Sequence, residues 1–117
     1  MATVLVIEDD SMTRQLIGEI VGECGHDIWQ AANGEEGLML AHLLLPDLVI
    51  TDIVMPVKDG LVTIVELQEA FVGVKIIAMS AHPDKLKVAL RLGVQDVFLK
   101  PFNPQELGEA VQEALQA

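Results

Sequence analysis

Residues 46–56 read PDLVITDIVMP, and this stretch contains the pattern of a buried β-strand. We predict the strand at Leu48–Thr51, because its consecutive apolar residues would face both sides of a sheet. A strand that is buried on both faces is typical of a parallel sheet covered by helices. Asp52 directly follows the predicted strand, which places a carboxylate at the edge of that sheet.

Short apolar runs alternate with longer helical patterns along the rest of the chain. Strands are expected at Thr3–Ile7, Asp27–Gln30, Leu48–Thr51, Val74–Met79 and Asp96–Leu99. Helices fill the gaps, with Ser11 as a candidate N-cap of the first, Asn33 of the second, and Pro104 beginning the fifth. The third is expected from Gly60 to Phe71 and the fourth from Pro83 to Gly93. This order of strand and helix predicts the α/β fold class, with an open, doubly wound sheet.

The chain is short and strongly acidic. Its 117 residues include 18 Asp plus Glu and 7 Lys plus Arg, and 51% of them are hydrophobic. This length predicts one domain, residues 1–117. The net charge of −11 argues against direct nucleic-acid binding and against docking on anionic membranes, since phosphates are held mainly by Lys and Arg. One cysteine, Cys24, allows no intramolecular disulfide, and we expect no signal peptide or membrane span, hence a cytoplasmic protein.

Charged or hydroxyl residues follow most of the predicted strands. They are Glu8, Asp9 and Asp10 after the first strand, Asp52 after the third, Ser80 after the fourth and Lys100 after the fifth. In open α/β sheets, ligands bind beyond the carboxyl ends of the strands, where these residues lie. Converging carboxylates repel one another and favour a divalent cation such as Mg²⁺, while Lys100 supplies one positive charge. Taken singly, each residue has an ordinary alternative: Asp10 or Ser80 as a helix cap, and Lys100 as a solvated side chain.

Taken together, several segments resemble the receiver domain of bacterial two-component response regulators, such as the chemotaxis response regulator. They are residues 6–10 (VIEDD), residues 46–56, Asp59-Gly60, residues 78–81 (AMSA) and residues 99–102 (LKPF). The resemblance extends over essentially all 117 residues and implies a single receiver domain. It also implies a flavodoxin-like (βα)5 fold, whose parallel strands lie in the order 2-1-3-4-5.

The resemblance implies a role for the acidic residues and for Lys100. Asp52 matches the aspartate that accepts a phosphoryl group as an acyl phosphate. Glu8 and Asp9 match the acidic pair that holds Mg²⁺ (or Mn²⁺), and the backbone carbonyl of Val54 matches a further ligand of that metal. Lys100 matches the lysine that pairs with the phosphoryl group.

The implied function is a phosphorylation-dependent signalling switch. The donor would be a phosphohistidine on a histidine kinase or a histidine phosphotransfer protein, and the target a downstream protein or output domain. We expect the responsive surface at the fourth helix, fifth strand and fifth helix. Such a domain promotes its own phosphorylation and dephosphorylation but does not turn over an external substrate, so it is not classed as an enzyme. The resemblance also implies a cis peptide bond before Pro101.

The switch residues depart from the family pattern at one position. Ser80 matches the hydroxyl residue that closes onto the phosphoryl oxygens, but Val97 occupies the position where family members usually have an aromatic residue. Phe98 cannot replace that ring, because adjacent strand residues point to opposite faces. Our hypothesis is that Ser80 and the loop Ala81–Pro83 move without a large ring following them.

Three further residues are expected to modify the chemistry. Glu8 stands where many family members have Asp, and its extra methylene favours a water-mediated contact with the metal. Val54 and His82 lie two residues beyond Asp52 and Ser80, where family residues flank the path of the hydrolytic water. Apolar Val54 would slow hydrolysis, whereas His82 is either a donor to the phosphoryl group or an ordinary loop residue.

Other functions fit the strand ends less well. A flavodoxin needs a hydroxyl-rich phosphate loop after the first strand, and a dehalogenase-type phosphatase needs a second Asp at the position of Val54. The remaining alternative is a receiver-like interaction module that works without phosphorylation. The complete set of strand-end residues argues against that alternative.

Overall fold

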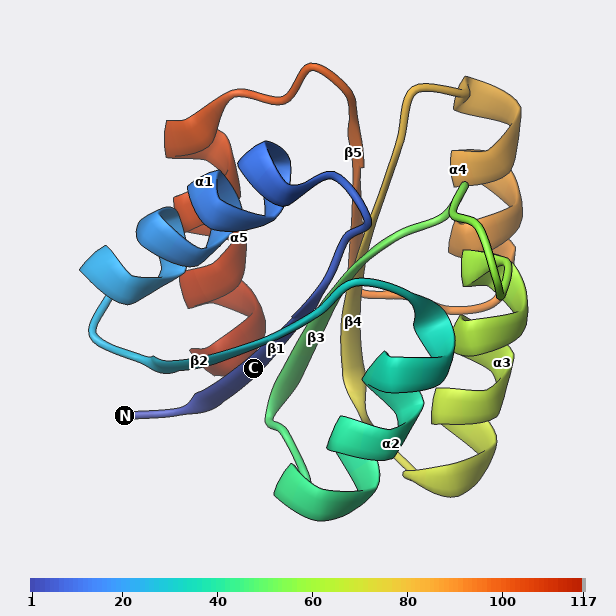
Figure 1. The fold of residues 1–117 in the computed structure, drawn as a ribbon. Coiled ribbons are helices and arrows are strands. Elements are labelled where there is room, and N and C mark those ends of the chain that lie inside the picture. Colours follow the sequence, from blue (N-terminus) through green and yellow to red (C-terminus); the bar gives the residue numbers. More distant parts are fainter. Residues whose placement is uncertain (117) are drawn as a thin grey trace.

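The strands of the chain lie in one parallel sheet (Figure 1), and the computed structural model describes residues 1–116. The strands are β1 (Thr3–Ile7), β2 (Asp27–Ala31), β3 (Leu48–Asp52), β4 (Lys75–Ser80) and β5 (Asp96–Leu99). Their order in the sheet is β2-β1-β3-β4-β5, and every neighbouring pair is parallel. The predicted fold class and strand order are therefore confirmed.

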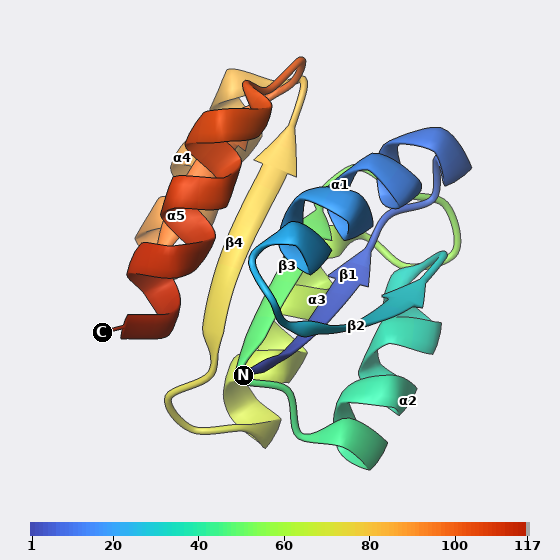
Figure 2. The same ribbon diagram turned by 90° about the vertical axis from the view of Figure 1, so that its left-hand side faces the viewer.

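The helices cover both faces of this sheet. They are α1 (Ser11–Glu23), α2 (Gly34–Leu44), α3 (Gly60–Ala70), α4 (Pro83–Arg91) and α5 (Pro104–Gln116). Figures 1 and 2 show α1 and α5 on one face, with α2, α3 and α4 on the other. Among residues 1–116, no helix is long and apolar enough to cross a membrane.

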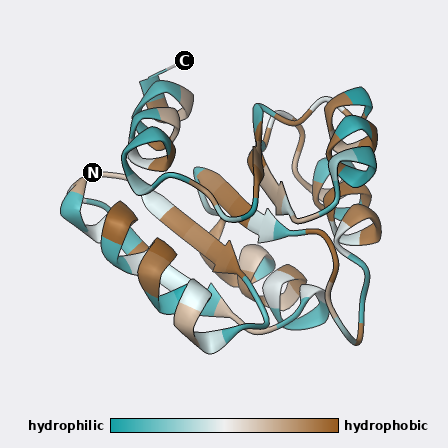
Figure 3. Ribbon diagram, turned by 90° about the horizontal axis from the view of Figure 1, so that it is seen from above, coloured by the Kyte–Doolittle hydropathy of each residue, from teal (hydrophilic) through white to brown (hydrophobic). Residues whose placement is uncertain are grey.

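Alternating side chains of the central strands form two hydrophobic cores. In β1, Val4 and Val6 pack against α1 and α5, whereas Leu5 and Ile7 pack in the core that contains residues of α2, α3 and α4. The strands are mostly brown in Figure 3, where they lie between the two helical layers. The apolar run Leu48–Thr51 is fully buried, as its sequence predicted, and it carries Asp52 to the carboxyl edge.

The ends of the helices decide between two predicted caps. Asp10, not Ser11, is the N-cap of α1: its Oδ2 accepts hydrogen bonds from the Thr13 N–H at 2.9 Å and the Thr13 hydroxyl at 2.6 Å. The expectation that Ser11 caps this helix is wrong, because Ser11 is already its first helical residue. Asn33 caps α2 as predicted, with Oδ1 accepting from the Glu36 N–H at 2.9 Å.

Candidate functional site

The register of the parallel strands brings the predicted site residues to one edge. Ile7 pairs with Thr51, so Glu8 and Asp52 follow side by side at the ends of β1 and β3. Ser80 of β4 pairs with Leu99, so Lys100 follows directly beyond the end of β5. Its backbone N–H also donates to the carbonyl of Ser80 at 2.9 Å, which fixes the start of the β5–α5 loop.

Three carboxylates form a cluster at this edge. One carboxylate oxygen from each of Glu8, Asp9 and Asp52 lies within 4.8 Å of the other two. Glu8 is 1% exposed and Asp52 is 6% exposed, whereas Asp9 is open to solvent. The cluster therefore has a buried floor and one exposed side through which a ligand can approach.

Lys100 is the cation that accompanies these acids. Its Nζ lies 2.6 Å from Oε1 of Glu8 and 3.2 Å from Oδ2 of Asp52. The alternative in which Lys100 is simply solvated is wrong. Two buried carboxylates repel each other and lose hydration. An ammonium between them offsets part of both costs.

Backbone N–H groups orient the same carboxylates. Oδ1 of Asp52 accepts from the Ile53 N–H at 2.9 Å, and Oε2 of Glu8 accepts from the Asp10 N–H at 3.2 Å. Arg14 donates from Nη1 to the carbonyl oxygen of Glu8 at 2.8 Å. Both side chains are thus held in place before any ligand arrives.

Burial dominates the electrostatics of Glu8. The pKa of Glu8 is raised to about 7. Loss of hydration is the largest cause and the charge of Asp52 adds to it, while Lys100 and the Asp10 N–H only partly offset these two effects. Burial also acts to lower the pKa of Lys100, but its hydrogen bond to Glu8 and the charges of both carboxylates outweigh burial and raise it. Lys100 therefore stays charged, and burial sets the affinity of Glu8 for a proton.

Ser80 lies at the same edge and is not the N-cap of α4. It is 1% exposed at the end of β4, and its Oγ accepts from the His82 N–H at 3.0 Å. The N-cap of α4 is His82, whose side chain makes no capping hydrogen bond. Ala81 and His82 are exposed, so the segment after Ser80 has room to move.

Val97 and Phe98 point to opposite sides of the sheet, as the strand alternation predicts. Val97 packs against the core on the side of α4, whereas Phe98 packs against the core on the side of α5. The peptide bond between Lys100 and Pro101 is cis, as the resemblance implied. Val54 lies in the loop after β3, and its side chain is 47% exposed.

Two residues that contact the site are not predicted from the sequence to take part in it. Arg14 carries no motif signal, because its contact with the Glu8 carbonyl depends on how α1 docks. Gly60 was noted only as part of a motif. Its N–H donates to the carbonyl of Ile53 at 2.7 Å, and a Cβ there would collide with the carbonyl oxygen of Asp52. Only glycine allows the start of α3 to pack this closely against the backbone of Asp52 and Ile53.

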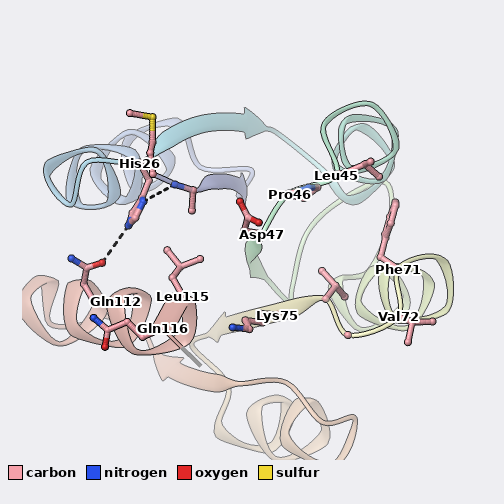
Figure 4. Close-up of a pocket in the computed structure, with 14 residues that line it drawn as sticks. His26, Leu45, Pro46, Asp47, Phe71, Val72, Lys75, Gln112, Leu115 and Gln116 are labelled. Carbon is pink, nitrogen blue, oxygen red and sulfur yellow. Dashed lines mark hydrogen bonds between the residues drawn. The ribbon is translucent and has the colours of Figure 1, made fainter.

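A separate cavity of about 740 Å³ lies at the opposite edge of the sheet (Figure 4). His26 there accepts from the Ala2 N–H at 3.1 Å on Nδ1 and pairs through Nε2 with Gln112 at 3.2 Å. Asp47 accepts from the Thr3 N–H at 2.8 Å. These contacts tie together the start of the sheet and α5, far from the strand ends that carry the carboxylate cluster.

Comparisons with known proteins agree with this geometry. The family model of the response regulator receiver domain matches residues 4–112. The chain is 38% identical over 114 residues to a protein of Halalkalibacterium halodurans named "Probable C4-dicarboxylate response regulator DctR", covering 94% of this chain and 50% of that protein. It is 33% identical over 116 residues to the chemotaxis protein CheY of Halobacterium salinarum, covering 97% of both.

A solved structure gives the same result for the fold. The response regulator receiver domain protein of Clostridium thermocellum superimposes with a TM-score of 0.92 at 28% identity, covering 99% of this chain and 95% of that one. The chain spans about half the length of the first curated relatives it matches.

Proposed function

Because the chain belongs to the response regulator receiver domain family, we propose that it is a phosphorylation-dependent switch with Asp52 as the phosphoacceptor. The family is a signalling module of two-component systems and not a turnover enzyme for external substrates. The observation that carries the proposal is the Lys100 ammonium, held between the buried carboxylates of Glu8 and Asp52. A phosphoryl group on Asp52 would have a fixed positive charge beside it.

The proposed reaction is phosphoryl transfer from a phosphohistidine. The Asp52 carboxylate attacks phosphorus, a P–O bond forms, and the P–N bond breaks with its electron pair returning to the imidazole nitrogen. The Ile53 N–H, 2.9 Å from Oδ1, keeps the attacking carboxylate oriented. Lys100 stabilises negative charge on the phosphoryl oxygens, a role in which preorganised charges are most effective.

The carboxylate cluster is suited to a divalent cation. Glu8, Asp9 and Asp52 offer hard oxygen donors close together, and we propose the carbonyl of Val54 as a further donor. These donors fit Mg²⁺ (or Mn²⁺) better than a softer metal. When bound, such an ion neutralises charge shared by the carboxylates and the incoming phosphoryl group.

We propose that the switch lies in the segment after Ser80. The Ser80 hydroxyl would leave the His82 N–H and turn to the phosphoryl oxygens, drawing Ala81 and His82 with it. Since Val97 has replaced the usual aromatic residue, no large ring would follow this motion. The proposed output surface is α4, β5 and α5, where α4 presents Lys85, Lys87 and Arg91 to a partner.

The proposed partners are a histidine kinase or histidine phosphotransfer protein as donor, and a downstream protein or output domain as target. We place this exchange in the cytoplasm, with residues 1–117 acting as one receiver unit. Half-exposed Val54 would slow hydrolysis of the acyl phosphate, and exposed His82 would contact the phosphoryl group or remain a loop residue. Unchanged acyl-phosphate lifetimes in Val54→Asn and His82→Ala would remove both roles.

The test uses small phosphoryl donors with Mg²⁺. The protein is incubated with acetyl phosphate, or with phosphoramidate to reproduce a P–N donor, and its intact mass is measured. We expect one added phosphoryl group in the native protein and none in Asp52→Asn. A matched control is Asp59→Asn, which changes an exposed helix-capping acid and should still be phosphorylated. No gain from either donor would favour the phosphorylation-independent interaction module.

A further inference from the structure

The charges of the chain are unevenly distributed. Residues 15–57 contain no Lys or Arg. Apart from Asp52, the acids of this segment are Glu19, Glu23, Asp27, Glu35, Glu36 and Asp47. Lys58, the next basic residue along the chain, is paired with Glu66 of α3 at 2.7 Å. The residues of β2 and α2 themselves therefore carry formal negative charge only, although the paired Lys58 side chain lies against Gly34 at the start of α2.

The same side exposes large apolar side chains. Met39 and Leu43 of α2 are 63% and 77% exposed, and Trp29 of β2 is 48% exposed. Leu40 of α2 is half-buried. We call these four residues the β2–α2 surface.

The members of the β2–α2 surface lie next to one another. Trp29 pairs with Leu5, whose side chain packs in the core that also contains Ala41, so Trp29 lies on the α2 side of the sheet. The ring of His42 is 5.0 Å from that of Phe71 at the end of α3, so His42 marks the side of α2 that faces α3.

Helical geometry then orders the rest of the surface. Successive residues of a helix are about 100° apart, so Leu40 lies about 200° from His42, on the side of α2 that faces β2. Met39 and Leu43 are one turn apart and point outward between these two sides. Figures 1 and 2 show β2 running beside α2. The apolar strip is therefore continuous from the sheet edge across the helix.

Acidic side chains stand at both ends of this strip. Glu35 and Glu36 lie in the first turn of α2. At the other end, Asp27 pairs with Thr3, and Asp47 accepts a hydrogen bond from the Thr3 N–H, so both acids lie at the same edge of the sheet. Asp47 also lines the cavity at that edge (Figure 4), so this end of the strip lies beside the cavity.

The helices α4 and α5 lack this combination. Exposed α5 carries Glu106, Glu109 and Glu113, but among its described residues no large hydrophobic side chain is exposed. On α4, exposed Leu90 lies among the basic residues Lys87 and Arg91. Of α2, α4 and α5, only α2 therefore combines exposed apolar area with acidic neighbours; α1 also exposes Met12 and Leu16, but it carries the basic Arg14.

We propose that the β2–α2 surface is a docking site for a basic amphipathic helix of another protein. Its apolar face would cover Trp29, Met39 and Leu43, and Lys or Arg near its ends would meet the acids at the two ends of the strip. A second copy of this chain is a poorer occupant, since it would bring a net charge of −11 toward an acidic face. This site is separate from the phosphorylation edge and does not depend on phosphoryl chemistry.

The test uses a synthetic helical peptide of about 14 residues, or four turns, with Leu along one face and Lys at both ends. Peptide with Glu in place of Lys is the control ligand. Binding to ¹⁵N-labelled protein is followed by NMR, and we expect shifts at the Trp29 indole and at residues 35–43 with the Lys peptide only. Pure charge attraction predicts shifts along acidic α5 instead, which would overturn the proposal.

Variants of the protein distinguish binding through apolar contacts from non-specific charge attraction. The double variant Met39→Lys/Leu43→Lys removes two exposed apolar side chains from the β2–α2 surface. It should weaken binding of the Lys peptide about tenfold or more. Leu90→Lys is the matched control, because it places the same charge at an exposed leucine of α4 and should have a much smaller effect. Equal weakening by both changes would contradict the proposal. The proposal would also be contradicted if sedimentation showed that the native protein is a dimer and that Leu43→Lys converts it to a monomer. The occupant of the surface would then be a second copy. Phosphorylation of Asp52 should be unchanged in these variants, which keeps this test independent of the proposed function.

Discussion

The ammonium of Lys100 lies 2.6 Å from the carboxylate of Glu8, although the two residues are 92 positions apart in the sequence. In the sheet, β3 and β4 lie between the strands that carry them. Lys100 therefore reaches across two strand ends and also contacts Asp52. This one side chain connects the predicted metal site to the predicted phosphoacceptor.

Replacing Lys100 by Met should impair both stability and phosphorylation. Without the ammonium, two buried carboxylates lose their cation, and we expect the metal-free protein to lose about 1–3 kcal/mol of unfolding free energy. This is below the loss for a fully buried pair, because Lys100 is partly exposed. Urea unfolding measures the first effect, and the rate of phosphorylation by phosphoramidate measures the second. Lys87→Met, an exposed change on α4, should leave both quantities unchanged; equal effects of the two variants would contradict the role of Lys100.

Mg²⁺ binding should weaken as the pH falls, because Glu8 must lose a proton to act as a ligand. With a pKa of about 7, Glu8 is mostly ionised at pH 8 and mostly protonated at pH 6, so the apparent affinity should fall about tenfold between them. Calorimetric titration measures this dependence. Glu8→Gln should bind more weakly and show a flatter pH profile, and an equally steep profile in that variant would assign the proton to another group.

The same shift predicts the stability of the metal-free protein. The pKa of folded Glu8 is raised above its ordinary value, so protonation favours the folded state. This contribution is complete below the unfolded pKa of about 4.5 and is lost as the pH rises through about 7. Added Mg²⁺ should restore stability at the higher pH, and this restoration should be smaller in Glu8→Gln.

Gly60→Ala should distort the loop that follows the proposed phosphoacceptor, Asp52. The new methyl group would collide with the backbone of Asp52 and Ile53, and overpacking of this kind costs about 1–3 kcal/mol. Gly108→Ala is the matched control: its Cβ would lie 3.7 Å from Cγ2 of Ile20 in α1, an ordinary van der Waals contact, and helix propensity should stabilise the protein by about 0.5–1 kcal/mol. Thermal unfolding and phosphorylation rates compare the two. A neutral Gly60→Ala would show that the loop can relax away from this contact.

Phosphorylation should change the NMR spectrum locally. If Ser80 and the following loop move while Val97 stays in place, shifts should concentrate within residues 80–100 and remain small on the far side of the sheet. Restoring an aromatic residue with Val97→Phe tests whether the chain can use a ring as well. Shifts spread equally along the native chain would reject the hypothesis of a local motion.

Much of the fold could be predicted because buried strands and helices have a recognisable spacing of apolar residues in the sequence. The run Leu48–Thr51 is apolar on both faces, and this pattern identified a central parallel strand directly. The cap of α1 was harder, since Asp10 and Ser11 are both good N-caps and the choice depends on where the chain leaves β1. Val57, with a φ of 72°, could not be foreseen, because loop closure and not its β-branched side chain imposes that conformation.

The closeness of the strand-end residues was predictable, but the contacts between them were not. Strand order brings Glu8, Asp52 and Lys100 to one edge, yet sequence alone does not show that Lys100 reaches Glu8 more closely than Asp52. The burial of Glu8 and the contact of Arg14 with its carbonyl depend on side-chain packing that no short motif records.

Locating the phosphoryl group is the most direct test of the central proposal. The native protein is treated with phosphoramidate and Mg²⁺, digested under conditions that preserve acyl phosphates, and analysed by tandem mass spectrometry. We expect one phosphoryl group on Asp52 and its loss in Asp52→Asn, while Asp59→Asn retains it. A phosphoryl group on another residue, or one that persists in Asp52→Asn, would contradict the proposal that Asp52 is the phosphoacceptor.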